Sequence, residues 1–298
     1  MTGTGYDVTQ PVPFIVCHPR SGSTLLRLML DAHPDLAIPP ETMFHGVFEL
    51  SRSPPPAAEL PRAVLTAMMG SQRWNDMNVS ADVLLDAFTG MGDKFSISEG
   101  LRTYYRLYAA QHGKARFGDK TPGHIFLIPT IAALLPEAVF LHMIRDGRDI
   151  AASMRHLWFG PGGDMRKLAE SWLKFLAAGF DAATNYPDRY LEVRYEDLAV
   201  NPEPVLRRIL AAIDLSFDPA MLRQHERAAE RLSELGELRE ADGGLYATRE
   251  AHQGIHRRAL EPTNPDQIGR FHRDLSAAET AAFEDVAGSM LKKLGYLS

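Results

Sequence analysis

Hydrophobic and polar positions near the start of the chain change their period within a few residues. Residues 14–17 form an uninterrupted apolar run that ends at His18-Pro19, which is typical of a buried strand. After a short polar segment, apolar side chains recur at helical spacing until His33-Pro34, namely Leu25, Leu28, Met29 and Ala32. The pattern therefore predicts a strand, a tight loop and a helix, in that order.

Three later segments extend this pattern. Residues 138–144 (AVFLHMI) predict a strand that leads through Arg145 into a helix with one apolar face, made of Ile150, Met154, Leu157 and Trp158. The stretch RYLEVRYEDL predicts another strand, after which Asn201-Pro202 begins a helix. A further short strand is expected over residues 114–117, just before Gly118-Asp119-Lys120.

Strands that alternate with helices predict an α/β protein of three layers, in which helices flank a central, mostly parallel sheet. Ligands of such sheets bind beyond the carboxyl ends of the strands. Arg20, Lys120 and Arg145 each fall just past a predicted strand end, so we expect them to meet at one edge.

About residues 47–112 differ from this alternation and predict a helical cap insertion. SRSPPPAAELP (residues 51–61) is typical of a turn or linker, and helical patches follow it. One helical stripe is expected in the core, formed by Leu101, Tyr104, Tyr105 and Tyr108. We therefore expect a single domain over residues 1–298, with a cap above the sheet edge where an acceptor substrate would be selected.

The last sixty residues predict a loop and a helix. ADGGLYATREAHQG and the residues after it, about 241–258, are typical of a mobile loop. Ser276 and Glu279 have the spacing of a capping box at the start of the final helix. The apolar face of that helix is expected to hold Phe283, Val286, Ala287, Met290, Leu291 and Leu294.

Composition narrows the class of protein. The chain has 298 residues, 45% of them hydrophobic and 23% charged, with a formal net charge of −6. An acidic chain is a poor general binder of nucleic acid or of anionic membranes, which both require basic surfaces. The N-terminus lacks the pattern of a signal peptide, and no apolar run approaches the ~20 residues that span a bilayer. We expect a soluble, cytoplasmic protein without a nucleic-acid or membrane partner, and a homodimer is the default oligomer.

The hinge between the first strand and helix has the composition of an anion site. Its residues are Arg20, Ser21, Gly22, Ser23 and Thr24. Glycine permits a tight backbone path, and the N–H groups and hydroxyls at the start of a helix favour a phosphate or sulfate. A nucleoside triphosphatase loop ends in Gly-Lys-Ser/Thr, but this loop has arginine and no lysine. The next strand likewise ends in Arg145 and not in a metal-binding carboxylate.

A longer segment carries a family resemblance. HPRSGSTLLRLMLDAHPDLAIPPET resembles the 5′-phosphosulfate-binding segment of the sulfotransferases that use 3′-phosphoadenosine 5′-phosphosulfate, and is most similar to that of the tyrosylprotein sulfotransferases and related bacterial enzymes. FLHMIRDGRDIAASM is similar to their 3′-phosphate-binding segment, and RYEDL to a strand-end Tyr-Glu segment. The resemblance covers residues 13–42 and 118–204. It implies a P-loop-like fold and transfer of a sulfuryl group to an acceptor hydroxyl.

The resemblance also implies roles for single residues in binding the donor. Arg20 and the loop would flank the 5′-phosphate, Arg145 and Ser153 would hold the 3′-phosphate, and Tyr195 would lie near the nucleotide. Relatives carry another arginine four residues after the serine, where this chain has Leu157. Its expected substitutes are Arg155 or His156, and Arg257 and Arg258 are expected to reach the same phosphate from the tail.

For the transfer itself, the resemblance implies Glu41 as the base for the acceptor proton. Lys120 and Arg20 would stabilise charge on the departing nucleotide. His45 and His124 remain alternative bases, whereas His142 and Cys17 are expected to be core residues. No residues have zinc-ligand spacing, so no metal is expected.

The acceptor is left open between a small hydroxylated metabolite and a peptide. Two other classes of function also remain open. One is an ATP-dependent kinase on the same kind of fold, and the other is a nucleotide-binding protein without catalysis.

Overall fold

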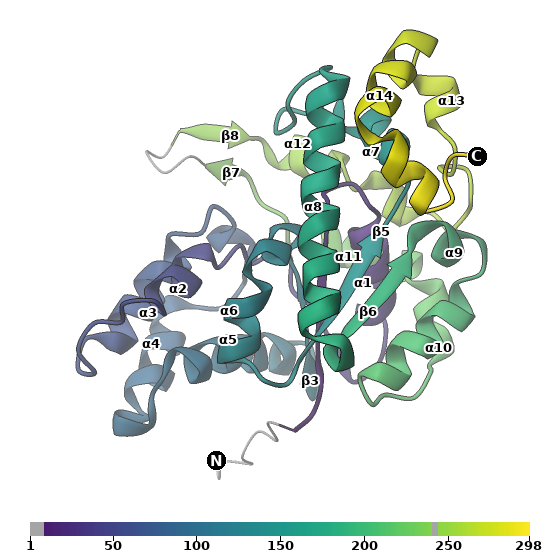
Figure 1. Cartoon of the computed structure of the whole chain (residues 1–298). Helices are drawn as coiled ribbons and strands as arrows, with labels where there is room; N and C mark the ends of the chain where they lie inside the picture. The colour runs from purple at the N-terminus through teal and green to yellow at the C-terminus, as the bar shows by residue number, and fades with distance from the viewer. Residues whose placement is uncertain (1–8, 240–243) are drawn as a thin grey trace.

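A parallel sheet forms the centre of the molecule. The computed structural model describes residues 9–239 and 244–298. Four strands pair in the order β4-β1-β5-β6, with the bounds Asp119–Lys120, Val12–Cys17, Ala138–Ile144 and Tyr190–Arg194 (Figure 1). All three pairings are parallel. The predicted α/β fold with a central parallel sheet is confirmed.

Alternation along the strands divides the core between the two faces of the sheet. Phe14 and Phe140 point into one cluster of buried side chains, whereas Ile15 and Leu141, the next residues along each strand, point into a second cluster. The second cluster also contains residues of helices α1 (Ser23–Asp31) and α10 (Pro202–Ala212). The sheet is therefore the middle of three layers.

The opposite face is covered by helices from two parts of the chain. In Figure 1, α8 crosses in front of the sheet, and α7 and α14 lie beside its upper half. These helices, α7 (Gly147–Met154), α8 (Met165–Asn185) and α14 (Ala277–Lys293), share a third apolar cluster that includes Trp172 and Phe283. The capping box of Ser276 and Glu279 is confirmed at the start of α14.

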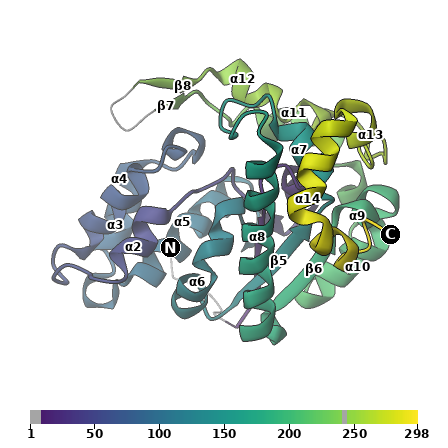
Figure 2. The same ribbon diagram turned by 45° about the horizontal axis from the view of Figure 1, so that its top comes forward.

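The segment for which a cap insertion was predicted is helical. It contains α2 (His45–Leu50), α3 (Leu60–Met69), α4 (Ala81–Thr89) and α5 (Ile97–Gln111), gathered at one side of the sheet (Figure 2). The predicted stripe on α5 is fully buried, with Leu101, Tyr104, Tyr105 and Tyr108 each at most 1% exposed. Tyr105 packs edge-on against Phe14 of β1 with ring centroids 6.3 Å apart. The cap therefore shares its core with the sheet.

Shorter elements complete the chain. They are β2 (Leu36–Ala37), β3 (Arg116–Phe117), α6 (Ile128–Leu134), α9 (Tyr195–Val200), α11 (His225–Leu232), β7 (Leu238–Arg239), β8 (Leu245–Ala247), α12 (Arg249–Gly254) and α13 (Phe271–Asp274). In the described part of the chain, no helix combines the length and the apolar character needed to cross a membrane.

Several local predictions were wrong. Residues 244–258 were expected in a mobile loop, but they contain β8, α12 and the start of a 3-10 helix; residues 240–243 lie outside the described residues. Helix α7 ends at Met154, so Leu157 and Trp158 lie beyond it. Helix α8 is not among the elements expected from the sequence, and α9 begins directly after β6, before the helix start expected at Asn201.

Candidate functional site

A cavity of about 410 Å³ opens at the carboxyl edge of the sheet. Each of the four strands leads into a residue that lines it: Arg20 after β1, Thr121 after β4, Arg145 after β5 and Tyr195 after β6. The strand ends of a parallel sheet share one edge, which explains why residues so distant in sequence meet here. The expectation for Arg20 and Arg145 is confirmed. Lys120 is the last residue of β4 and is buried beside the cavity.

The loop between β1 and α1 is shaped by two residues with positive φ, Arg20 at 72° and Gly22 at 97°. A Cβ atom on Gly22 would lie 2.4 Å from the ring of Tyr195, so only glycine fits this close approach. Ser23 and Thr24 follow at the start of α1 and line the cavity. The hydroxyl of Ser21 donates to the carbonyl oxygen of His18 at 2.7 Å, so it stabilises the turn and does not face the cavity.

Arg145 is held rigidly at the cavity wall. Its guanidinium lies 4.1 Å from the centre of the Tyr195 ring and donates to the carbonyl oxygens of Gln267 at 2.6 Å and Arg20 at 3.3 Å. Its Nε is buried and has no hydrogen-bond partner within the described residues. A buried donor without a partner is costly, so this atom indicates a ligand that accepts a hydrogen bond.

Arg20 links the loop to helix α7. Its Nε donates to the hydroxyl of Ser153 at 3.1 Å, and an Nη donates to the carbonyl oxygen of Ile255. Burial, together with the positive charges of Arg145 and Arg270, lowers the pKa of Arg20 to about 10. Arg145 and Arg270 each have a carboxylate partner as well, Asp149 at 3.5 Å and Asp274 at 2.6 Å. Three arginines, two of them close enough to lower the pKa of the third, still favour an anionic ligand at this end of the cavity.

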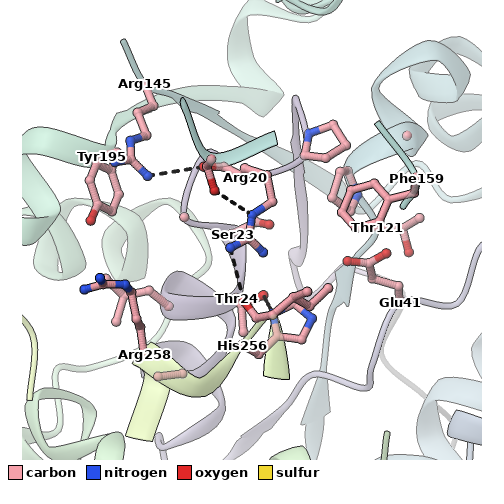
Figure 3. A pocket seen from close by; sticks show the side chains of 18 of the residues that line it. Arg20, Ser23, Thr24, Glu41, Thr121, Arg145, Phe159, Tyr195, His256 and Arg258 are labelled. Atoms are coloured by element: carbon pink, nitrogen blue, oxygen red, sulfur yellow. Dashed lines mark hydrogen bonds between the residues drawn. The ribbon is translucent and has the colours of Figure 1, made fainter. Parts of the chain in front are cut away.

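The tail supplies one of its two predicted arginines. Both are exposed, but Arg258 lines the cavity, opposite the loop in Figure 3, whereas Arg257 lies outside the lining. The expected substitutes for the missing arginine are also outside the lining. Arg155 pairs with Glu279 at 3.0 Å, and His156 is exposed. The predicted roles of Arg257, Arg155 and His156 are therefore not supported by their positions.

Glu41 lies at the other end of the cavity and forms two ion pairs. One oxygen accepts from Nζ of Lys120 at 2.6 Å, and the other accepts from Arg73 at 3.2 Å. Burial by itself would raise the pKa of Glu41, but Lys120 and Arg73 lower it well below its ordinary range. Burial lowers the pKa of Lys120, which Glu41 partly offsets. The pair is thus a carboxylate and an ammonium in contact, at the cavity wall.

The alternative bases occupy different positions. His124 is fully buried and lies 2.9 Å from a carboxylate oxygen of Asp119, outside the cavity lining. His45 does line the cavity. His142 is a core residue as predicted, with its ring nitrogen 2.6 Å from the hydroxyl of Tyr190. Cys17 is fully buried, and burial raises the pKa of its thiol to about 12, which excludes an activated thiolate.

Three basic lining residues were not foreseen: Arg73, His256 and Arg270. Arg73 contacts His252 and Asp76 as well as Glu41. His256 lies 3.1 Å from the hydroxyl of Thr24, and burial, followed by the charges of Lys120 and Arg20, lowers its pKa well below the ordinary value. All three lie in turns or at helix ends, where apolar periodicity gives no signal. Residues 9–239 and 244–298 contain no group of three or more His, Cys, Asp or Glu side chains arranged to hold a metal ion.

The fold and the cavity together define an α/β protein with the start of a helix and several arginines at one cavity, an arrangement that suits a phosphate- or sulfate-bearing ligand. A model of the sulfotransferase family matches residues 11–219. The chain therefore belongs to the sulfotransferase family, as the sequence resemblance predicted, and its function is that of a sulfotransferase.

Individual relatives agree with this assignment. A Caenorhabditis briggsae protein assigned as a protein-tyrosine sulfotransferase is 31% identical over 216 residues, which cover 70% of this chain and 67% of that protein. Protein-tyrosine sulfotransferase A of Caenorhabditis elegans is 26% identical over 303 aligned positions, covering 98% and 69% of the two chains. The solved sulfotransferase domain of the Synechococcus PCC 7002 olefin synthase is similar in fold, with a TM-score of 0.61, 21% identity and 94% coverage of both chains.

Proposed function

We propose that the protein transfers a sulfuryl group from 3′-phosphoadenosine 5′-phosphosulfate to an acceptor hydroxyl. The observation that carries this proposal is the presence, in one cavity, of an arginine-rich anion site and of the Glu41–Lys120 pair. The names of the two worm relatives point to the hydroxyl of tyrosine as their acceptor, which supports a hydroxyl acceptor here.

The residues at the arginine-rich end fit such a donor. The Nε of Arg145 has no hydrogen-bond partner within the described residues and would gain one from a ligand, and the neighbouring positive charges of Arg145 and Arg270 around Arg20 favour an anion. We assign the 3′-phosphate to Arg145, Ser153 and Arg258, and the 5′-phosphate to Arg20 and the start of α1. Ser23 and Thr24 would add hydroxyl donors to the free N–H groups of that helix end.

When bound, the donor supplies a sulfuryl group whose bond to the 5′-phosphate oxygen breaks as a bond to the acceptor oxygen forms. Glu41 would take the proton of the acceptor hydroxyl, and the electron pair of the broken bond would remain on the departing phosphate oxygen. Lys120 would stabilise that new negative charge. Residues at both ends of the cavity thus have defined tasks, and no covalent intermediate with the protein is required.

The contact between Lys120 and Glu41 suggests how the base becomes active. While Lys120 donates to Glu41, the low pKa of the carboxylate makes it a weak base. If the ammonium turns towards the departing oxygen, Glu41 loses its strongest positive neighbour and its pKa rises. The carboxylate would therefore become basic only when the donor is in place.

The kinase alternative lacks its two main residues. The loop has no lysine, and Arg145 directly follows β5 where a metal-binding carboxylate would be required. A purely nucleotide-binding protein would have no use for the Glu41–Lys120 pair at the cavity wall.

Calorimetric titration of the purified protein with adenosine 3′,5′-bisphosphate, and separately with ATP and Mg²⁺, tests the donor. We expect micromolar binding of the bisphosphate and weak or no binding of ATP. Arg145→Ala should weaken bisphosphate binding about 10- to 100-fold, as expected for losing charge-assisted hydrogen bonds. Arg52→Ala is the matched control, since Arg52 is exposed on the cap and lies outside the cavity lining.

Transfer of ³⁵S from labelled donor to a hydroxyl compound then tests the reaction. Glu41→Gln should abolish transfer and leave bisphosphate affinity nearly unchanged. A preference for ATP, or equal affinity for adenosine 5′-phosphate and the 3′,5′-bisphosphate, would overturn the proposal.

A further inference from the structure

The two ends of the cavity differ sharply in chemistry. Arg145, Tyr195 and Arg258 lie together at one end in Figure 3, whereas Phe159 lies at the other end, beside Glu41 and Thr121. If the first end holds the donor, the acceptor must approach Glu41 from the second. The side chains around Phe159 therefore decide which acceptors can bind.

Two further aromatic side chains line the cavity and extend the aromatic surface that Phe159 begins. Trp158 lines the cavity, is 37% exposed and packs edge-on against Phe159 with ring centroids 5.1 Å apart. Phe175 of α8 lines it as well and packs against Phe126 at 4.6 Å. A large apolar side chain that stays exposed inside a catalytic cavity gains free energy when an apolar ligand covers it.

The segment that carries Trp158 and Phe159 has changed its chemistry relative to the family pattern. A phosphate-binding arginine is expected at the position of Leu157, and two aromatic residues follow instead. Because α7 ends at Met154, this segment leaves the helix and brings Phe159 to the Glu41 end. It contributes apolar surface to the cavity and supplies no arginine to the 3′-phosphate.

No cation among the described lining residues at this end is available to an anionic acceptor. Arg73 is engaged by Glu41, Asp76 and His252. Burial and the neighbouring His124 lower the pKa of His45, so its ring is neutral at neutral pH. Outside the lining, Lys174 lies 5.3 Å from the ring of Phe126. A carboxylate brought here would lose its hydration without gaining a counter-ion, and it would face Glu41.

We infer that the acceptor is an uncharged aromatic hydroxyl compound, bound against Trp158, Phe159 and Phe175. It is small, because the cavity of about 410 Å³ must hold the donor as well. This inference rests on the proposed function and adds to it the class of acceptor. Trp158 and Phe159 are then specificity-determining residues, since their rings place the acceptor hydroxyl beside Glu41 and give no support to a negative charge. A tyrosine peptide, the acceptor class in the names of the relatives, is the competing occupant.

A matched acceptor panel tests the inference. The purified protein is given labelled donor and one of four acceptors: 2-naphthol, 6-hydroxy-2-naphthoate, a tyrosine peptide with blocked ends, and the same peptide flanked by glutamates. The first two differ only in one carboxylate. We expect kcat/KM for 2-naphthol to exceed that of each of the other three at least about tenfold. Equal or better use of the naphthoate or of either peptide would overturn the inference.

Variants assign the effect to the aromatic side chains. Trp158→Ala should raise KM for 2-naphthol about tenfold and leave the affinity for adenosine 3′,5′-bisphosphate unchanged. Phe159→Arg should raise the ratio of naphthoate to naphthol turnover about tenfold, because it places a cation at the acceptor end. If this charged variant does not fold, Phe159→Leu tests the same position by removing the aromatic ring. Met69→Ala is the control, since Met69 is 47% exposed on α3 and lies outside the lining.

The measurements separate failure of this inference from failure of the proposed function. Bisphosphate binding without turnover of 2-naphthol, together with turnover of a peptide, would refute the acceptor class and leave the donor assignment intact. Absence of bisphosphate binding would refute the proposed function itself. A Trp158→Ala enzyme with unchanged KM for 2-naphthol would show that the aromatic residues do not form the acceptor site.

Discussion

The carboxylate of Glu41 is controlled by two cations, and they differ in what each can do. Lys120 has a flexible ammonium that can leave the carboxylate for a departing oxygen. Arg73 is fixed by Asp76 and His252 as well as by Glu41, so its charge remains beside the carboxylate throughout. Arg73 is therefore a positioning residue that keeps Glu41 oriented and ionised.

Arg73→Gln should shift the pH dependence of the reaction. Glu41 acts in its ionised form, and its low pKa keeps it ionised across neutral pH, so kcat/KM of the native enzyme should not decline from about pH 8 to about pH 6. Removing the charge of Arg73 raises the pKa of Glu41, so the acidic decline should move to higher pH. The pH profile of kcat/KM measures this, and superimposable profiles for the two enzymes would contradict it.

The same residues show what sequence can and cannot predict about a site. Glu41, Lys120 and Arg145 follow strand ends or carry a family motif, so pattern and resemblance together point to them. Arg73 and His256 lie in turns, where no periodicity reports which way a side chain faces. Ser21 was predicted to bind the ligand, but its hydroxyl donates to the carbonyl oxygen of His18. A serine hydroxyl in a loop can bond to a ligand or to the backbone of its own turn, and the sequence does not distinguish the two.

Among the elements, helix α8 packs unusually close to the sheet. A Cβ atom on Gly179 would lie 2.1 Å from the ring of His142 on β5, so the contact depends on the missing side chain. Leu168, Trp172, Leu176 and Gly179 lie at helical spacing and are all buried, and this pattern could have predicted α8. We did not predict α8, because it begins after an irregular turn and not directly after a strand.

Gly179→Ala should destabilise the protein by about 1–3 kcal/mol, since the added methyl group forces apart two well-packed elements. Gly288→Ala is the matched control. Gly288 also lies inside a long helix, α14, but nothing is within 4 Å of its added Cβ, so this change should be neutral or stabilise by up to about 1 kcal/mol. Urea unfolding monitored by circular dichroism measures both; equal effects would show that α8 adapts to the methyl group without cost.

At the scale of the whole molecule, the cap and the sheet share a core. One cluster of buried side chains joins Phe14 and Phe140 of the sheet with Phe44, Tyr104 and Tyr105 of the cap region. A cap that buried its own separate core could unfold alone, but here its unfolding would expose one face of the sheet. The sequence prediction of a single domain depends on this shared core. An apolar stripe on a helix shows that one face is buried, but it does not show which other element covers that face.

We therefore expect one cooperative unfolding transition. Tryptophan fluorescence reports on both regions, since Trp74 lies in the cap and Trp172 against the sheet, and circular dichroism reports on all helices. The two signals should give coincident urea curves for the native protein and for a Trp74→Phe variant. An early fluorescence transition that is absent from Trp74→Phe would instead show that the cap unfolds separately.

Buried histidines should make this cooperative unit sensitive to mild acid. Burial lowers the pKa of His142 from 6.5 to about 3, so below pH 6.5 the unfolded chain binds a proton that the folded chain does not. The free energy of unfolding therefore falls with pH, and from pH 7.5 to pH 5 this one residue should cost about 2 kcal/mol. Asp149, Glu196 and Glu234 act in the opposite direction, because burial raises their pKa values.

Comparison of His142→Gln with the native protein isolates this contribution from the carboxylates. The variant lacks the titrating ring, so its deficit in unfolding free energy relative to the native protein should be about 2 kcal/mol smaller at pH 5 than at pH 7.5. His156→Gln, at an exposed position, is the control for histidine removal.

The proposed chemistry needs Glu41 ionised, and the fold needs His142 neutral. Because Glu41 stays ionised to lower pH than the fold stays stable, activity in acid should be lost when the protein unfolds and not when Glu41 is protonated. If the unfolding free energy of His142→Gln falls short of the native value by the same amount at pH 5 and pH 7.5, His142 does not make the fold sensitive to acid, and this expectation is refuted.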